Sequence, residues 1–264
     1  MIKGIDVSAN NGIINWQNVN GIDFVMVKAT QGRGCSKSTE LLRNFTDSKF
    51  KNNIQGAFKK GFKCGVYHFL TASNVKEAEK EADYFIKVIM PYKDKISLYA
   101  AVDVEDAAES KYSRLPKTKT ELTNIVNAFT DKISKAGFKP AIYTNRDFLQ
   151  NRMYFDGLKC KTIWRAHWFS NYATSFEMVS AEQKPIDYAT DMPLWQFGMA
   201  QKGYISGINS EIDINYGYYE KVAETPDFCR LVSNKCRFEQ QTINYLNQYK
   251  YADELWRRLW EAMK

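Results

Sequence analysis

The sequence is poor in residues that bind metals or form disulfides. Its 264 residues include two histidines and five cysteines, and the cysteines are scattered with no C-x-x-C pair. Zinc sites and disulfide frameworks require such residues at close, regular spacing. We therefore expect no metal, no other cofactor and no disulfide scaffold.

Long apolar runs are also missing. No window approaches the length of a membrane span, and the first residues, MIKGIDVSAN, lack the apolar core of a signal peptide. We therefore expect no membrane insertion, and synthesis in a cytoplasm. The composition, 44% hydrophobic and 25% charged, is typical of a globular protein.

Basic residues exceed acidic ones without forming a basic block. The net charge of +7 favours anionic surroundings such as nucleic acid, anionic lipid or an acidic cell-wall polymer. The densest basic stretches, KFKNN and FKKGFK, are interrupted by apolar positions. A nucleic-acid binder would carry a clustered basic stripe or a recognition motif, so we expect no nucleic acid as a partner.

The first 220 residues alternate short β-branched or aromatic runs with longer amphipathic segments. This pattern predicts strands joined by crossover helices in a parallel α/β barrel. After residue 145 the helical segments are short and poorly patterned, so we expect an irregular, TIM-like barrel. The predicted strands are 3–7, 23–30, 63–69, 97–105, 140–144, 161–168, 193–197 and 210–215, and the predicted helices are 40–60, 74–90 and 118–136.

Residues 223–264 predict a helical extension beyond a barrel domain of residues 1–222. Apolar positions recur at helical spacing from Leu246 to Met263, with Trp256 and Trp260 among them. About forty residues cannot bury a core alone. The extension must therefore pack on the barrel, pair with a second copy of the chain, or place its apolar face on a partner such as the cell wall.

The stretch YAAVDVEDAA, residues 99–108, ends a buried strand with two acids. Because side chains alternate along a strand, Asp103 and Glu105 should point into the barrel while Val102 and Val104 face the helices. Parallel barrels carry their active sites at the carboxyl ends of the strands. Two neighbouring carboxyls in a partly desolvated pocket raise the pKa of at least one, as general acid catalysis near neutrality requires.

Two further acids lie in the first and last predicted strands. Asp6 closes the first strand and Asp213 lies in the last, and barrel closure would bring these strands side by side. We expect the four acids to converge on one cleft, although Asp6 and Asp213 taken singly could be strand-end caps. Lys28 could pair with them or extend to solvent. His68 should point away from the interior as a core histidine.

Seven fragments occur in an order and spacing that resemble a known family: MIKGIDVSANNGIINW, FVMVKATQG, GVYHF, VDVE, IYTN, LWQF and EIDIN. Over about residues 1–220 they resemble the glycoside hydrolase family 25 lysozymes, the Chalaropsis-type muramidases of bacteriophage endolysins and bacterial cell-wall enzymes. The resemblance implies a flattened, irregular β/α barrel. It also implies cleavage of the β-1,4 bond between N-acetylmuramic acid and N-acetylglucosamine in peptidoglycan, by an enzyme that reaches the wall from the host cytoplasm at lysis.

The resemblance also implies a role for each acid. Glu105 would be the general acid, and Asp103 would orient the 2-acetamido group or tune Glu105. Asp6 and Asp213 would hold charge or water. Retaining, inverting and substrate-assisted routes all remain open, because they differ in a carboxylate separation that a sequence does not contain.

Substrate contacts form a second set of candidates. We expect sugar binding from aromatic residues at motif positions and from the basic residue already named, although isolated aromatics often belong to the core; these candidates are Tyr67, Tyr143, Trp164, Trp195 and Lys28. The sequence departs from the family pattern at Gln31, where Glu is frequent, and at His167 and Trp168. A chitin-cutting enzyme and a non-catalytic glycan-binding barrel are the alternatives.

Overall fold

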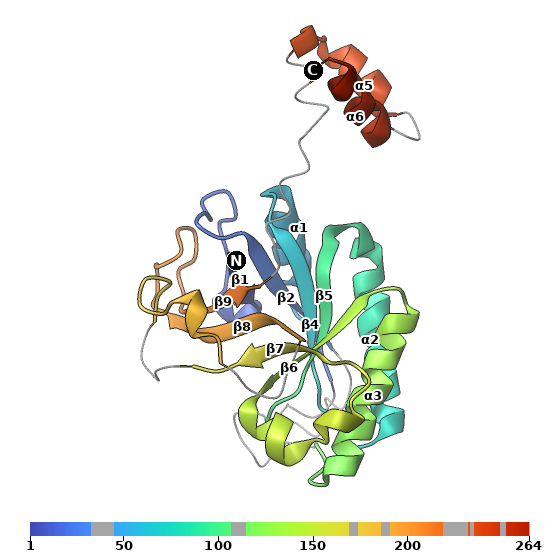
Figure 1. Cartoon of the computed structure of the whole chain (residues 1–264), viewed down its shortest axis with the longest axis vertical. Coiled ribbons are helices and arrows are strands. Elements are labelled where there is room, and N and C mark those ends of the chain that lie inside the picture. Colours follow the sequence, from blue (N-terminus) through green and yellow to red (C-terminus); the bar gives the residue numbers. More distant parts are fainter. Residues whose placement is uncertain are drawn as a thin grey trace. The chain divides into compact units, whose positions relative to one another are not determined.

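Nine β-strands form one sheet in the part of the chain described by the computed structural model, which comprises residues 1–32, 45–106, 115–168, 174–185, 191–218, 232, 235–248 and 252–263. The chain divides into two compact units, Met1–Tyr218 and Tyr219–Lys264, and Figure 1 shows the elements of each. The strands are β1 (Ile2–Val7), β2 (Phe24–Gln31), β3 (Phe45–Thr46), β4 (Lys63–Phe69), β5 (Ile96–Asp103), β6 (Lys139–Asn145), β7 (Thr162–Ala166), β8 (Asp191–Ala200) and β9 (Ile212–Gly217).

Eight of these strands close into a barrel. The sheet order is β1-β9-β8-β7-β6-β5-β4-β2-β3, and an additional pairing of β1 with β2 joins the two ends. The short β3 pairs only with the end of β2 and stays outside the closed ring. The predicted TIM-like α/β barrel is therefore confirmed.

The expectation that all strands run parallel is wrong for β9. This strand pairs antiparallel with both β8 and β1, whereas the other neighbouring strands of the barrel pair in parallel. The connection from β8 to β9, residues 201–211, is too short for a helical crossover, which a parallel pair would need. As a result the beginning of β9 lies at the carboxyl end of the barrel.

Three α-helices cover the described part of the barrel: α1 (Phe50–Lys59), α2 (Val75–Ile89) and α3 (Lys119–Lys135). The Asn74 side chain caps α2 by accepting from the backbone N–H of Glu77, as its residue type predicts. Helices α2 and α3 lie side by side (Figure 1). The predicted helix 40–60 is too long, because residues 45–46 are the strand β3, and 33–44 lie outside the described residues.

The second half of the barrel has no long crossover helix among its described residues. A π-helical turn at Phe148–Arg152 and a 3-10 turn at Phe155–Gly157 connect β6 to β7, and another 3-10 turn, Ala181–Gln183, precedes β8. The irregularity expected after residue 145 is confirmed.

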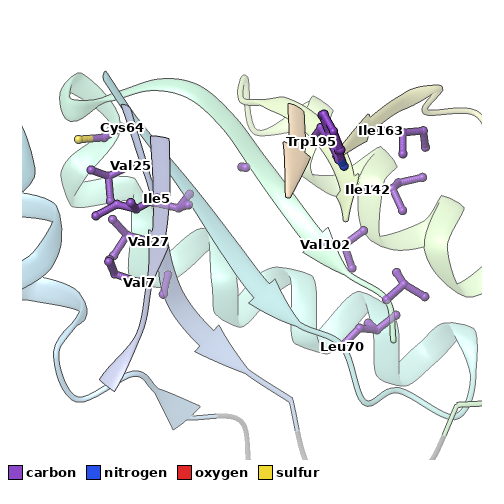
Figure 2. Packing of buried hydrophobic residues seen from close by; sticks show 14 of the residues in the cluster. Ile5, Val7, Val25, Val27, Cys64, Leu70, Val102, Ile142, Ile163 and Trp195 are labelled. Carbon is purple, nitrogen blue, oxygen red and sulfur yellow. The ribbon is translucent and has the colours of Figure 1, made fainter. Parts of the chain in front are cut away.

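The main apolar core lies between the outer faces of the strands and the helices. Figure 2 shows residues of this layer, including Val27, Val102 and Ile142. The alternate residues fill the barrel interior, where glycines permit close packing. A Cβ atom added at Gly4 would lie 2.3 Å from the ring of Phe24. Val102 and Val104 both belong to the outer core layer. The prediction that the valines of the VDVE stretch face the helices is therefore confirmed.

A buried hydrogen-bonded network ties α2 to the strands. The imidazole of His68 is fully buried, with Nδ1 2.6 Å from Thr30 Oγ1 and Nε2 2.9 Å from Glu81 Oε2. Glu81 also accepts from the backbone N–H of Thr71 at 3.0 Å and from its hydroxyl at 2.8 Å. His68 thus points away from the interior as a satisfied core histidine, as predicted.

We predict that Glu81→Ala destabilises the barrel by about 2–4 kcal/mol, because it removes the carboxylate that bonds His68 Nε2 and accepts from the N–H and hydroxyl of Thr71 in a buried setting. Denaturant unfolding measures the loss. Glu79→Ala on the exposed face of the same helix is the matched control and should change stability by less than about 0.5 kcal/mol. Equal midpoints for the two variants would contradict a structural role for the network.

The second unit contains two short helices, α5 (Gln240–Asn247) and α6 (Ala252–Ala262). The apolar repeat from Leu246 to Met263 is therefore interrupted between the helices. The indole of Trp256 is 2% exposed, packs near Phe238 and donates to Asn247 Oδ1 at 2.8 Å. Trp256 thus belongs to the interior of this unit, the Trp260 side chain lies outside the described residues, and the partner of the extension stays a prediction.

Within the described ranges, no helix combines the length and apolar character that a membrane crossing requires.

Candidate active site

The four predicted acids come together at the carboxyl end of the barrel. Asp6 lies near the end of β1 and is the direct register partner of Asp213, the second residue of the reversed β9. Asp103 ends β5, and Glu105 follows two residues later. The charge of Asp6 acts on the pKa of each of the other three carboxyls, so all four share one electrostatic environment.

Backbone contacts hold the segment that carries Glu105. The N–H of Val104 donates to the carbonyl of Tyr143 at 2.9 Å, and the carbonyl of Val104 accepts from the buried hydroxyl of Thr144 at 2.7 Å. On the other side, the N–H of Leu70 donates to the carbonyl of Asp103 at 3.0 Å. The chain therefore stays in the sheet direction beyond the end of β5, and Glu105 keeps the facing that strand alternation predicts.

Burial keeps protons on these acids near neutrality. Desolvation raises the pKa of Glu105 to about 7, against the lowering effect of Lys28 and with a further increase from Asp6. Desolvation, followed by the charges of Asp6 and Glu105, raises the pKa of Asp213 to about 8. The pKa of Asp103 is also raised well above that of an ordinary aspartate, first by burial and then by the charge of Glu105. The cluster is thus rich in carboxylic acid at pH 7.

Asp6 is the member of the cluster with the strongest hydrogen-bond support for its ionised form. Its Oδ2 accepts from Asn215 Nδ2 at 2.8 Å and from Gln196 Nε2 at 3.0 Å. Burial raises the pKa of Asp6 to about 6, and these two hydrogen bonds oppose that rise. At pH 7 the environment therefore leaves Asp6 mostly ionised, Glu105 partly protonated and Asp213 mostly protonated, and acid–base catalysis uses such a separation of pKa values.

Asp103 offers an oxygen with no partner. Its side chain is 5% exposed, and Oδ1 is buried without a hydrogen bond to any residue that the structure describes. A buried polar atom of this kind costs free energy unless a bound group or water satisfies it. Oδ1 of Asp103 is therefore available to a donor on a ligand.

Lys28 acts on the acids at longer range. Its ammonium donates to Gln31 Oε1 at 2.9 Å and lies 5.1 Å from the centre of the Phe69 ring. It lowers the pKa values of Asp103 and Glu105 through its charge. The structure thus places Lys28 beside the cluster, with Gln31 as its hydrogen-bond partner.

Three of the four predicted aromatic residues form the floor beneath the acids. The ring of Trp164 packs edge-on against Tyr67 and Tyr143, with centroids 5.7 Å and 4.6 Å away. Burial raises the pKa values of both tyrosines well above the usual range, and the carboxylates of the cluster add to this. Trp164 is only 1% exposed, so it supports the site from below.

The prediction that Trp195 contacts sugar is wrong. Its side chain is fully buried on the outer face of β8, where it packs near Phe197 and Tyr216 (Figure 2 labels Trp195 within the core). The reason is strand alternation, since the next residue, Gln196, points inward to Asp6.

Sequence reasoning missed three residues of the site: Gln196, Asn215 and Trp168. Asn215 follows Asp213 by two positions and therefore shares its face, and its Oδ1 accepts from Trp164 Nε1 at 2.8 Å. Gln196 Oε1 accepts from the Tyr143 hydroxyl and from Trp168 Nε1, each at 2.9 Å. The alternation rule applied to LWQF and EIDIN would have identified the two amides.

Across the described ranges, no group of three or more histidine, cysteine or carboxylate side chains has a geometry that could hold a metal ion.

A TIM-like barrel with a buried carboxyl cluster at the carboxyl ends of its strands has the architecture and acid–base groups of a glycoside hydrolase. The sequence agrees with this class, because residues 5–208 match the model of glycosyl hydrolases family 25. The chain belongs to this family.

Named relatives extend the comparison. The chain is 24% identical over 216 residues to the autolytic lysozyme of Clostridium acetobutylicum, covering 81% of this chain and 55% of that protein. It is 27% identical over 220 residues to lysozyme M1 of Streptomyces globisporus, covering 81% of this chain and 67% of that protein. The chain thus spans little more than half of the clostridial relative.

The fold comparison gives the same architecture. The catalytic domain of endolysin ply40 from bacteriophage P40 of Listeria monocytogenes superposes with a TM-score of 0.60 at 19% identity, covering 82% of this chain and 93% of that domain.

We predict that Asp213→Asn stabilises the protein above pH 8, by on the order of 1 kcal/mol. Because burial raises the folded-state pKa of Asp213 to about 8, its stabilising contribution is complete below the pKa of about 4 in the unfolded chain and is lost as pH rises through 8. The neutral amide avoids that loss. Thermal unfolding at pH 4 and pH 9 measures the effect, and a gain that is larger at pH 4 would contradict the assignment.

Proposed function

We propose that the protein is a peptidoglycan hydrolase that cleaves the β-1,4 bond between N-acetylmuramic acid and N-acetylglucosamine. The observation that supports this best is the carboxyl of Glu105, which desolvation keeps partly protonated near neutrality, with a pKa of about 7, beside Asp6, whose pKa of about 6 leaves it mostly ionised. Membership of family 25 and the lysozyme names of the relatives support the same substrate class.

In this proposal Glu105 is the general acid that protonates the glycosidic oxygen as the bond breaks. The positive charge that develops on the sugar ring is stabilised by the Asp6 carboxylate. Asp213, protonated at neutral pH, orients Asp6 or a water molecule. The unpartnered Oδ1 of Asp103 accepts from the N–H of a 2-acetamido group, and this contact would also position the acetamido oxygen for a substrate-assisted route.

In the proposal, the buried aromatic residues beneath the acids contribute little direct contact with the substrate. Tyr67 and Tyr143 are each 9% exposed and therefore present little surface to a ligand. Lys28 contributes positive charge near the acids. Trp164 supports these rings without reaching the sugar.

We predict that Glu105→Gln removes nearly all activity, by about 1,000-fold or more, while the unfolding midpoint is kept or raised. Mass analysis of the reducing ends released from purified peptidoglycan measures both the rate and the bond cut. Glu79→Gln, an exposed change on α2, is the matched control and should behave as the unsubstituted chain. Residual turnover above about one tenth in Glu105→Gln would remove this residue from the acid role.

The same assay distinguishes the alternatives. Ends that carry N-acetylmuramic acid identify a muramidase, whereas faster release from chitin would identify a chitinase-like enzyme. Binding of glycan without bond cleavage would identify a non-catalytic barrel; the full set of buried acids argues against that function, since burying carboxyls without a chemical use is costly.

We also propose that the enzyme serves host lysis in a bacteriophage, on the basis of the similarity to the phage endolysin domain. In that setting it would be made in the host cytoplasm and act on the wall once the membrane is breached.

The unit Tyr219–Lys264 is proposed to bind the wall or a second copy of the chain. We predict that a chain ending at Tyr218 keeps its activity on soluble glycan fragments but loses at least half of its retention on wall sacculi. Sedimentation with sacculi and light-scattering mass of both chains measure this. A truncated chain with unchanged retention and unchanged mass would assign the unit a purely structural role.

A further inference from the structure

Two indole N–H groups fix the orientation of the two amides that hold Asp6. Trp164 Nε1 donates to Asn215 Oδ1 at 2.8 Å, and Trp168 Nε1 donates to Gln196 Oε1 at 2.9 Å. An indole nitrogen donates only, so each amide must face it with its oxygen. The NH₂ groups of both amides are thereby directed to the same oxygen, Oδ2 of Asp6, at 2.8 Å and 3.0 Å.

This arrangement specifies the charge state of Asp6. Rotating the Gln196 amide would place its NH₂ against Trp168 Nε1, which can only donate, and would remove the acceptor of the Tyr143 hydroxyl. In the observed orientation Oδ2 of Asp6 receives two N–H groups, which favours the ionised carboxylate. The two indoles therefore act on Asp6 through the amides, without touching it.

The two indoles differ in their access to solvent. Trp164 is 1% exposed and belongs to the floor of the barrel, so its contact with Asn215 is shielded from solvent. Trp168 is 40% exposed and follows the end of β7, at the same end of the barrel as the acids. An exposed aromatic ring beside a carboxyl cluster is suited to stack on the apolar face of a sugar.

We propose that Trp168 is a substrate-sensing positioning residue, which stacks on a sugar ring of the glycan and, through Gln196, holds Asp6 in its ionised form. The inference rests on the proposed glycan substrate. Sugar bound on the indole restrains the ring in the position from which Nε1 reaches Gln196. Binding of a sugar at Trp168 is thereby coupled to the negative charge on Asp6, which the reaction needs.

Other charged and titratable groups also face Asp6 and set the background against which this effect is measured. Asp213 lies opposite on β9, and Asp103 and Glu105 approach from β5 and the segment beyond it. Asp6 also influences the phenols of Tyr67 and Tyr143. Lys28, on β2, is the cation that acts on the β5 acids.

Three substitutions separate stacking from positioning. Trp168→Phe keeps a ring for stacking but removes the N–H, and Trp168→Leu removes both. Phe58→Leu is the control, because Phe58 is similarly exposed at 43% but lies on α1 near its C-terminus. Each variant is measured for kcat and KM on soluble glycan fragments across pH, and for the titration of the Asp6 carboxyl by carbon NMR without substrate.

We expect Trp168→Phe to keep a KM within about twofold of the unsubstituted enzyme while the acidic limb of its kcat profile and the Asp6 midpoint move upward by roughly 0.5 pH unit. The direction follows because losing the donor frees the Gln196 amide, which weakens a contact that lowers the pKa of Asp6. Trp168→Leu should show the same upward movement and a KM raised about fivefold to tenfold. Phe58→Leu should change neither quantity.

Gln196→Met tests the connection directly. It should raise the Asp6 midpoint by itself and abolish any further effect of Trp168→Phe, as expected for two residues that act in series. An unchanged Asp6 midpoint in Trp168→Phe, or an unchanged KM in Trp168→Leu, would overturn the proposal. Absence of glycan cleavage by the unsubstituted enzyme would instead refute the proposed function, and the NMR titration would still decide the Trp168–Gln196–Asp6 connection.

Discussion

The structure depends on the desolvation of four carboxyls at one end of the barrel, of which Asp6 and Asp103 are buried and Glu105 and Asp213 are partly buried. Desolvation is the largest influence on each of their pKa values. Lys28 is the nearby cation that acts on two of them, and its ammonium is directed to Gln31. The negative charge of the cluster is therefore reduced mainly by protonation rather than by ion pairs with cations. Burying these carboxyls costs free energy, but it yields protonated acids that can take part in catalysis.

The rest of the barrel makes this arrangement possible. The outer faces of the strands pack against the helices and provide the hydrophobic stabilisation, while aromatic rings fill the interior below the acids. Two amides, Asn215 and Gln196, supply the hydrogen bonds that distinguish Asp6 from its neighbours. Similar carboxyls thus acquire different protonation states through their hydrogen-bond partners.

Much of this could be predicted from the sequence because strand alternation is a local property. The facing of Asp103, Glu105 and Val102 followed from period two alone, and so did the outward direction of His68. The reversal of β9 could not be predicted, since periodicity carries no information on strand direction. Trp195 was misassigned because its motif position was weighed above its alternation with Gln196. The facing of Asn215 and Gln196 also follows from alternation, but their hydrogen bonds to Asp6 and to the two indoles join segments distant in sequence, which no local pattern contains.

The central claim is that the folded barrel keeps a proton on Glu105 near neutrality. Carbon NMR of the labelled Glu105 carboxyl across pH 3 to 10, in the complete chain without ligand, tests it most directly. The account predicts a midpoint near pH 7. A midpoint near 4.3, the value of an unperturbed glutamate in water, would contradict it.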